Sequence, residues 1–514
     1  MAKMRNQINR RDFLKLASLL PLGVAAPRLM QALGTSTRQG QPRNVLMIVF
    51  DAWSSYNISL YGYERDTTPN INRLAKRAVR YHNHYAGGDY TTPGTATLLT
   101  GVLPWTNRAL RANDETEEYY ATRNIFGAFP NHYRIAYTHN GWANTLLKQF
   151  QHEINEYIAT EKLLLESYDN IIKVLFRRDE DLSSVSWARN MKVSDEGYAY
   201  SLLLSHVYED LQKKKVKDLL ELFPRGLPTT GSDNGFLVGQ AVDHITERLR
   251  SIPRPFAGYF HFLPPHYPYR TSSEFVDAFL NDGYKPIEKP VDIFGNKETR
   301  GYPLKRRIYD EYILYCDREF GRLYDILEGS GLLENTILVL TSDHGESFER
   351  GLNAHNIDAL YEPVIRIPLM IFEPGREEGM DIYQNTSAVD VLPTLAHLAG
   401  VSSPGWIEGM VLPPFSSTPQ VPDRNIHVVR AYRIKNSHDP ITTGSLVQVR
   451  ENYKLHYYFG YDQTPGDGVV RLFDVKSDPE EMNDLAAVKR ETAAEMLNEL
   501  KIKLKEVDEP YLKS

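Results

Sequence analysis

Two short segments and one aspartate carry side chains that could act on a charged ester. Thr91 stands two residues before Pro93, on a Pro/Gly turn that opens an apolar helix. Asp343 and His344 end one apolar stretch, and Asp51 ends another. Attack on a phosphate or sulfate ester needs an aligned nucleophile and positive charge near the developing oxygens, and a divalent ion supplies that charge. These residue types therefore suit a divalent-metal site with a hydroxyl nucleophile beside it.

The complete segments around these residues, Tyr90–Gly101 and Asp343–Glu346, resemble the sulfatase branch of the alkaline phosphatase superfamily. The Thr-Thr-Pro triplet alone is weak support, because it also occurs at Thr67–Pro69, where it lacks the small-residue helix and the Thr-Gly ending that follow Thr91. The resemblance implies that Thr91 is the nucleophile. It also implies one divalent metal ion, Ca, Mg, Mn or Zn, with the ligands Asp51, Thr91, Asp343 and His344.

Several histidines match other motifs of the same family. His266 lies in the stretch His261–Tyr269, which resembles the family's Pro-His-x-Pro-Tyr segment. His355 precedes Leu360–Leu369, where the family has an active-site histidine. His139 follows a strand where sulfatases keep Gly-Lys-Trp-His, so it would replace the lysine. The resemblance thus implies as catalytic residues Thr91, His266, His355 and His139, and as substrate-binding residues His261 and Thr95.

Three departures from the family pattern bear on the mechanism. Sulfatases carry Cys or Ser where Thr91 stands and oxidise it to formylglycine. A secondary alcohol cannot become an aldehyde, so no formylglycine is expected here. Thr95 replaces the arginine that supports formylglycine, and Ala52 replaces the second aspartate of the usual pair. Threonine nucleophiles resemble instead the phosphodiesterase and the phosphoethanolamine- or phosphoglycerol-transferase branches of the superfamily.

Three functions stay open at this point. The first is metal-dependent hydrolysis of a sulfate or phosphate ester through a covalent Thr91 intermediate, with a small-molecule, glycan or lipid substrate. The second is a transferase that moves a phospho-alcohol group onto an envelope glycan or lipid, although such enzymes usually carry several membrane spans. The third is a catalytically dead binding protein with the same fold. We expect the hydrolase, because a dead site has no need for a complete nucleophile and ligand set.

The N-terminus predicts export. Arg10 and Arg11 precede the short apolar run Leu16–Ala26, which is the pattern of a twin-arginine signal. We expect residues 1–35 to be this signal, the twin-arginine export machinery to be a partner, and the protein to be periplasmic or extracellular. No later stretch reaches the ~18–20 unbroken apolar residues of a membrane span, so none is expected in the mature chain. The net charge of -7 over 514 residues gives no sign of a nucleic-acid surface.

Apolar runs separated by helical patterns set the expected architecture. Asn44–Phe50 is continuously apolar, as in a strand buried on both faces of a parallel sheet. Strand–helix alternation predicts an α/β fold with a doubly wound, mostly parallel sheet flanked by helices. We expect the catalytic domain at residues 43–420, with a helical insert at about 146–227, and a small C-terminal α+β subdomain at 425–514. Further elements are expected at Ile135–Tyr137, Phe256–Phe262, Thr336–Leu340 and Leu369–Phe372 for strands, and at Val242–Leu249, Arg307–Gly329 and Ala388–Leu398 for helices.

Overall fold

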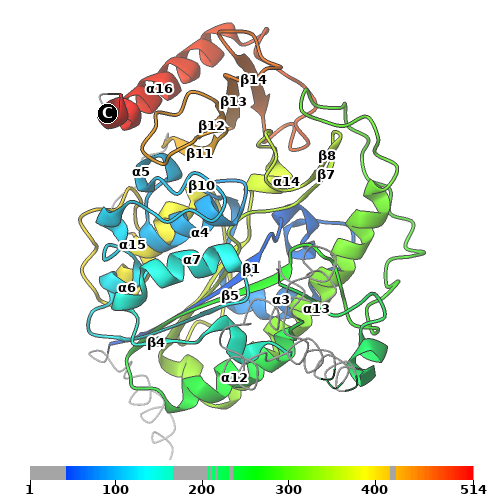
Figure 1. Cartoon of the computed structure of the whole chain (residues 1–514), viewed down its shortest axis with the longest axis vertical. Coiled ribbons are helices and arrows are strands. Elements are labelled where there is room, and N and C mark those ends of the chain that lie inside the picture. Colours follow the sequence, from blue (N-terminus) through cyan, green and yellow to red (C-terminus); the bar gives the residue numbers. More distant parts are fainter. Residues whose placement is uncertain are drawn as a thin grey trace, which may run out of the picture. The chain divides into compact units, whose positions relative to one another are not determined.

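The computed structural model describes residues 42–165, 217–230, 235–416 and 424–512, with the single positions 207, 211 and 214. Its central sheet has eight strands (Figure 1), with β9 antiparallel to both of its neighbours and every other pair parallel. The doubly wound, mostly parallel sheet is therefore confirmed. Across the sheet the strands are β10 (Met380–Ser387), β2 (Val79–Tyr85), β9 (Leu369–Phe372), β6 (Thr336–Thr341), β1 (Asn44–Asp51), β5 (Phe256–Pro265), β3 (Tyr133–Thr138) and β4 (Glu156–Tyr157).

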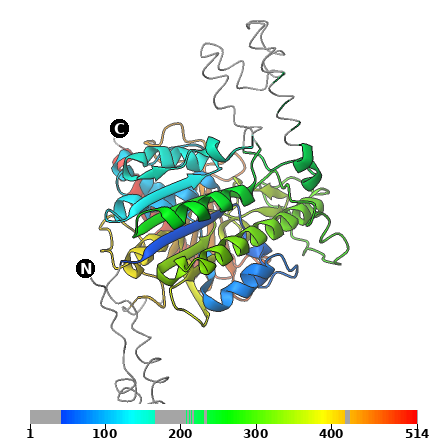
Figure 2. The same ribbon diagram turned by 90° about the horizontal axis from the view of Figure 1, so that it is seen from below.

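The central strand β1 lies between two layers of helices. All of its residues are buried. The even-numbered ones from Leu46 to Phe50 pack into one apolar cluster, and the odd-numbered ones from Val45 to Val49 pack into another on the opposite face. A strand that is apolar on both faces is continuous in sequence, which is why it was predictable. The first cluster includes α3 (Pro69–Leu74), α12 (Val238–Ser251) and α13 (Tyr302–Gly329), and the second includes α4 (Thr91–Thr100), α6 (Ile125–Ala128), α7 (Gly141–Gln149) and α15 (Val391–Leu398), as Figures 1 and 2 show.

The parallel strands deliver their polar ends to one edge of the sheet. Asp51 is the last residue of β1, and Asp343 follows β6 by two residues. His139 and Asn140 follow β3 directly, and α4 begins with Thr91. Open α/β sheets bind ligands outside the carboxyl ends of their strands. The topology alone therefore gathers the expected site at this edge.

The C-terminal part of the chain adds a second, antiparallel sheet with one long helix, as expected from the sequence. The sheet packs on the helix through a shared apolar cluster that also includes Trp105. Residues 43–514 nevertheless form one compact unit, so the two sheets belong to a single body. The elements are β11 (Ile426–Ala431), β12 (Gly444–Arg450), β13 (Tyr453–Phe459), β14 (Val469–Asp474) and α16 (Arg490–Asp508).

The start predicted for the helical insert, at about Leu146, lies instead within the central α/β layers. Leu146 is fully buried within α7, and β4 pairs in parallel with β3 at the edge of the central sheet. A two-residue strand is too short to show a periodic pattern, so the sequence could not reveal it. The strand β10 was also not expected, because it mixes exposed polar residues with buried ones. The predicted signal and most of the insert, at residues 166–206, lie outside the described residues.

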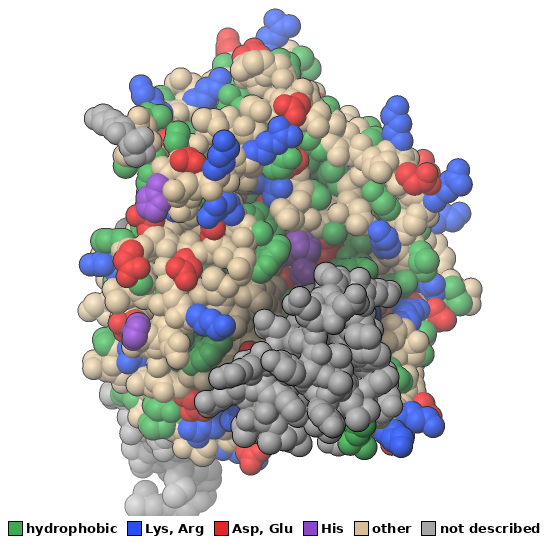
Figure 3. Space-filling model, viewed as in Figure 1, with side chains coloured by type: hydrophobic (Ala, Val, Ile, Leu, Met, Phe, Trp, Pro, Cys, Tyr) green, Lys and Arg blue, Asp and Glu red, His purple; other side chains and the backbone are tan. Residues whose placement is uncertain are grey.

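Two properties of the described residues bear on partners. Within the ranges that the structure covers, no helix combines the length and the apolar character needed to cross a membrane. On the face seen in Figure 3, basic and acidic side chains intermingle rather than forming a single-sign field. Because phosphate backbones are bound by clustered Lys and Arg, this face does not have the character of a nucleic-acid surface.

Acidification is expected to destabilise the fold through His84 on β2. The side chain is fully buried, and its Nδ1 lies 2.9 Å from Thr386 Oγ1. Burial, and after it the charge of Arg424, lowers the pKa of His84 from 6.5 to about 3. Between pH 6.5 and 3 the unfolded chain therefore binds a proton at His84 and the folded chain does not. The contribution of neutral His84 to the unfolding free energy is complete above pH 6.5 and is lost as the pH falls toward 3.

The variant His84→Asn tests this linkage. Between pH 6.5 and 4.5 the wild-type protein should lose about 2–3 kcal/mol more unfolding free energy than the variant, measured by urea denaturation at each pH. The slope is compared rather than the absolute stability, because the substitution also changes packing. Identical slopes in the two proteins would contradict the assignment.

Candidate active site

Four side chains converge at the carboxyl edge of the sheet, and all are fully buried: Asp51, His261, Asp343 and His344. His261 Nε2 lies 3.3 Å from Asp51 Oδ2 and 3.8 Å from Asp343 Oδ2. His344 Nε2 lies 3.2 Å from Asp51 Oδ1 and 3.8 Å from Asp343 Oδ2. Ligand atoms of Asp51, His261 and Asp343 all lie within 4.8 Å of one another. The predicted ligands are thus brought together, and His261, predicted to bind substrate, lies among them.

This donor set fits a divalent cation. In the described part of the chain, Asp51 Oδ1, His261 Nε2 and His344 Nε2 are buried without a hydrogen-bond partner. Buried polar atoms are normally paired, so three unpaired ones within one cluster suit the binding of a cation. His344 Nδ1 donates to the Gly345 carbonyl at 2.9 Å, which leaves Nε2 with a free lone pair toward the carboxylates.

The electrostatics of the two carboxylates agree with that fit. Burial, and next the charge of Asp51, raises the pKa of Asp343. Burial alone would also raise the pKa of Asp51, but the charge of His266 and the close approach of His261 and His344 hold that pKa well below its usual range. Two buried carboxylates this close repel each other unless a cation lies between them. Asp51, His261, Asp343 and His344 would hold that ion.

Thr91 lies beside the cluster, at the first turn of α4. Its Oγ1 donates to Asp51 Oδ2 at 3.5 Å. One turn later, Thr95 Oγ1 donates to Asp343 Oδ2 at 3.2 Å, so this predicted substrate-binding residue contacts a metal-binding carboxylate in the structure. The helix can approach so closely because Gly94 has no side chain, since a Cβ there would lie 2.2 Å from the Asp343 backbone oxygen. The nucleophile helix and the metal loop are therefore in direct contact.

Asn140 contacts the nucleophile, and the sequence motifs had not singled it out. Its Oδ1 accepts from Trp142 N at 2.7 Å and from Ala143 N at 3.2 Å, which caps α7. Because these two hydrogen bonds fix Oδ1 at the start of α7, the NH2 group on the opposite side of the amide faces Thr91. There Nδ2 donates to Thr91 Oγ1 at 3.1 Å and makes a short contact with Asp51 Oδ2. An Asn between a strand end and a helix start is a recognisable N-cap signal that could have drawn attention to it.

Asn140→Ala is expected to lower kcat by about 10–100-fold, because one fixed hydrogen bond to the nucleophile is lost. The substitution also removes a helix cap, and Asn124→Ala provides the matched control. Asn124 caps α6 in the same manner, accepting from Phe126 N and Gly127 N, but belongs to no part of the site. Both variants should lose about 1 kcal/mol of stability in thermal unfolding, and only Asn140→Ala should lose activity. Equal kcat values for the two variants would contradict this role.

The His139 ring packs against aromatic side chains, although His139 directly precedes Asn140. Its ring stacks on Phe236, with centroids 4.0 Å apart, and lies edge-on to Tyr137 at 4.9 Å. Burial, and after it the charge of His261, lowers the pKa of His139 to about 3, so the ring is neutral. It lines the same cavity as Thr91. The structure therefore places His139 in an aromatic wall, and the contacts to Thr91 expected of it are made by Asn140.

His266 and His355 lie beside the cluster, and a third group accompanies them. The His355 ring centroid lies 4.6 Å from that of His266 and 4.4 Å from that of His344. His355 Nδ1 lies 3.2 Å from each carboxyl oxygen of Glu346, a residue to which the sequence motifs assigned no role. Burial raises the pKa of Glu346 to about 8, and burial followed by the charge of His344 lowers that of His355 to about 3. The Glu346–His355 pair therefore holds one proton near neutral pH.

A cavity of about 530 Å³ opens onto Thr91, with Asn140, Trp142, His266 and Tyr267 among its walls. Its described lining includes no Lys or Arg. The first turns of α4 and α7 both reach it, and α4 has no side-chain cap. The positive end of a helix dipole and its free N–H groups favour an anion. Two helix N-termini therefore provide part of the positive field that an anionic ester needs.

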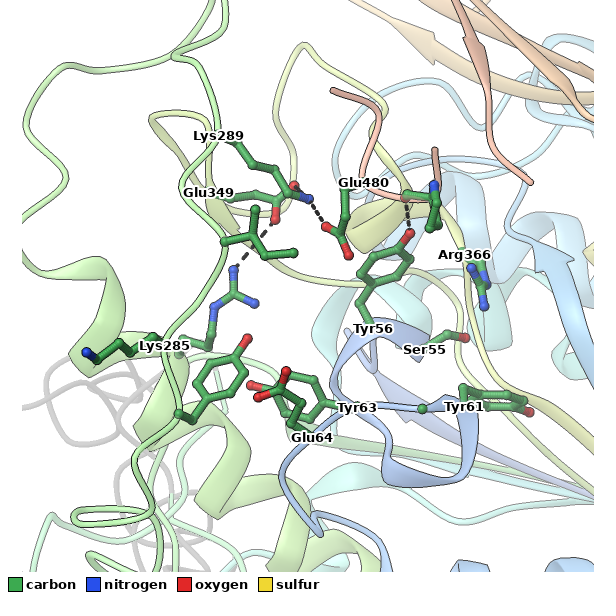
Figure 4. A pocket seen from close by; sticks show the side chains of 15 residues that line it. Ser55, Tyr56, Tyr61, Tyr63, Glu64, Lys285, Lys289, Glu349, Arg366 and Glu480 are labelled. Carbon is green, nitrogen blue, oxygen red and sulfur yellow. Dashed lines mark hydrogen bonds and ion pairs between the residues drawn. The ribbon is translucent and has the colours of Figure 1, made fainter. Parts of the chain in front are cut away.

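A second cavity, of about 310 Å³, shares no lining residue with the first (Figure 4). Its walls carry several tyrosines and a group of charged side chains that pair with one another. Lys289 Nζ lies 2.9 Å from Glu349 Oε1 and 2.5 Å from Glu480 Oε2. Because none of the predicted site residues lines this second cavity, the candidate site is the Thr91 cavity.

Known proteins match this chain over most of its length. The Sulfatase family matches residues 43–401, and the family described as N-sulphoglucosamine sulphohydrolase, C-terminal, matches residues 354–510. The choline-sulfatase of Rhizobium meliloti (strain 1021) is 25% identical over 441 residues, which cover 81% of this chain and 77% of that protein.

Solved structures share the fold at lower identity. A structure in complex with D-glucosamine-2-N,6-O-disulfate gives a TM-score of 0.62 at 18% identity and covers 92% of this chain and 99% of its own. The phosphonate monoester hydrolase of Agrobacterium radiobacter gives 0.60 at 17% identity, with coverages of 90% and 95%. Since the family match spans well over half of the sequence, the chain belongs to the sulfatase family of the alkaline phosphatase superfamily and is an ester hydrolase of that class.

Proposed function

We propose that this enzyme hydrolyses sulfate or phosphate esters through a covalent ester on Thr91, without formylglycine. The observation that carries the proposal is the position of Thr91 Oγ1, which contacts Asp51 and Asn140 at the wall of the 530 Å³ cavity. Asn140 orients the oxygen, and the first turn of α4 brings it to the metal-binding cluster. A hydroxyl held in this way suits nucleophilic attack.

In the first step, Thr91 Oγ1 forms a bond to sulfur or phosphorus while the bond from that atom to the ester oxygen breaks. A divalent cation held by Asp51, His261, Asp343 and His344 would polarise the ester and favour the ionised Thr91 hydroxyl, whose proton is released to solvent before the attack. The proton of the Glu346–His355 pair passes to the leaving oxygen, so the product departs as a neutral alcohol. His266, whose ring lies next to His355, lines the same cavity as Thr91 and would contact the transferred group.

In the second step, water attacks the same sulfur or phosphorus atom and the Thr91 oxygen leaves. The Glu346–His355 pair takes one proton from the attacking water, which restores the state before the first step. The bond from Thr91 Oγ1 to sulfur or phosphorus breaks, the oxygen returns to the ionised form in which it began, and inorganic sulfate or phosphate is released. The sum of both steps is one ester plus one water giving one alcohol and one acid.

The substrate and the compartment are also proposals. The relatives named for choline sulfate and for a disulfated glucosamine support a small-molecule or glycan ester as substrate. The paired Arg10 and Arg11 before an apolar run support export by the twin-arginine route, and hence activity in the periplasm or outside the cell.

A side-by-side assay tests the proposal. The purified enzyme is offered p-nitrophenyl phosphate, bis-p-nitrophenyl phosphate and p-nitrophenyl sulfate, each with Mg, Mn, Zn or Ca. Metal-dependent release of p-nitrophenol together with free sulfate or phosphate supports hydrolysis. Transfer of the group to an added alcohol instead of water would indicate the transferase. A protein that purifies without a divalent ion and turns over no ester would be the inactive binding protein.

A further inference from the structure

A single buried arginine of the C-terminal sheet reaches both loops that carry reacting groups. Arg430 lies on β11, and its side chain is 7% exposed. Its Nη1 lies 3.0 Å from Asp89 Oδ2 and 3.3 Å from Asp89 Oδ1, and its Nε donates to Asp358 Oδ1 at 2.9 Å. Asp89 stands two residues before Thr91, and Asp358 stands three residues after His355. The arginine therefore bridges the nucleophile turn and the histidine loop.

The two loops are also bonded directly to each other at this point. The Asp89 carbonyl accepts from Asn356 N at 3.1 Å, and Asp89 Oδ2 accepts from Ile357 N at 3.0 Å. Asp89 is fully buried, so its carboxylate needs the charge of Arg430 as a counterion. Neither loop can shift without breaking hydrogen bonds to the other.

The backbone on both sides of His355 is left-handed, and this conformation must be held from outside. Ala354 has φ 71° and Asn356 has φ 57°, which are unfavourable values for residues other than glycine. Such residues persist only where surrounding contacts fix them. Arg430 Nη1 donates to Asn356 Oδ1 at 2.8 Å, so the arginine supplies one of these contacts.

β11 also packs directly against the nucleophile turn. Val429 N donates to the Gly87 carbonyl at 2.9 Å. A Cβ at Gly88 would lie 2.7 Å from the Pro93 ring and 3.3 Å from the Val429 carbonyl, so the turn and the strand are in contact without room for a side chain. The C-terminal sheet is therefore part of the support of the active site.

We infer that Arg430 is a positioning residue, which fixes His355 relative to Thr91 by joining Asp89 to the 356–358 loop. The inference rests on the proposed function, in which Thr91 attacks on one side of the sulfur or phosphorus atom and the Glu346–His355 pair serves the leaving oxygen. Displacement of one reacting group by about 1 Å can reduce the rate by about 100-fold, so a contact that sets this geometry acts on kcat.

The main test is the double variant Asp89→Asn/Arg430→Gln. Removing the arginine alone would leave a buried unpaired carboxylate and unfold part of the chain, whereas the double variant removes both charges together. We expect kcat to fall by about 10-fold or more, with KM and metal content close to the wild-type values. The loss should grow as the leaving group becomes more basic, because poor leaving groups depend most on the proton from His355.

Arg430→Lys and Arg433→Gln complete the test. Arg430→Lys keeps the charge but not the fork that reaches Asp89, Asp358 and Asn356 together, and it should show a smaller kcat loss of the same kind. Arg433, whose side chain is 60% exposed and pairs with Asp462, lies on the same segment, and Arg433→Gln should behave as wild type. The inference is overturned if the double variant has wild-type kcat, or if its loss is the same for every leaving group. If Thr91→Ala stays active, the proposed function fails instead, and the two failures are thus distinguishable.

Discussion

Thr91→Ala is expected to lower kcat for ester hydrolysis by at least about 1,000-fold while leaving the fold and the bound metal in place. The side chain is fully buried but small, and its hydroxyl contacts only Asp51 and Asn140 among the residues for which the structure gives hydrogen bonds. The alanine variant therefore loses a nucleophile without losing much packing. Steady-state kinetics, metal content and thermal unfolding measured on the same preparation separate these effects.

Two matched variants sharpen this result. Thr91→Ser keeps a hydroxyl at the same position and should retain a large part of the activity. Thr92→Ala removes the neighbouring hydroxyl, which accepts from Asn113 N at 3.0 Å and does not face the cluster, and should stay within a few-fold of wild type. An alanine variant at position 91 that hydrolyses esters at the wild-type rate would show that threonine is not the nucleophile.

Asp343→Asn is expected to remove metal binding and activity together. Asp343 Oδ1 accepts from Ala52 N at 3.3 Å and from His344 N at 3.0 Å, so the amide oxygen of asparagine can keep these bonds. The amide nitrogen then takes the place of Oδ2 and directs hydrogens at Thr95 and at the cation position. We expect metal affinity to fall by at least about 100-fold, measured by metal content after dialysis and by the thermal shift on adding Mn.

Asp317→Asn is the control for the loss of a buried carboxylate. Asp317 accepts from Asn70 N at 2.9 Å and from Ile71 N at 2.8 Å, and so caps α3 away from the site. This variant should lose thermal stability but keep its metal and its kcat. Full metal occupancy and normal turnover in Asp343→Asn would remove Asp343 from the ligand set.

The strands predicted best from the sequence are those whose own residues identify them as buried strands, without knowledge of their neighbours. β1, β5 and β6 are continuous apolar runs with both faces buried, so their strands and the polar residues at their ends could be identified directly. The edge strands β4 and β10 could not, because β4 has only two residues and most of the first half of β10 is exposed without a regular alternation. The start of the helical insert was misplaced for the same reason.

In the candidate site, too, some residues could be predicted from the sequence and others could not. Asp51, Asp343 and His344 end strands, and the topology places strand ends together. The choice between His139 and Asn140 depended on which of two adjacent side chains turns toward Thr91, and that depends on the cap of α7 rather than on the motif. Arg430 could not be predicted at all, since it contacts Asp89 across more than 300 residues of sequence.

The most direct test of the account is to look for the covalent intermediate on Thr91. His355→Ala should slow the attack of water while p-nitrophenol still leaves readily, so the intermediate should accumulate. After mixing with a p-nitrophenyl ester and rapid acid quench, mass spectrometry of the Thr91 peptide should show the added mass of one sulfuryl or phosphoryl group, in the same amount as the burst of p-nitrophenol. A full burst with an unmodified Thr91 peptide, or with the group on another residue, would contradict the threonine mechanism.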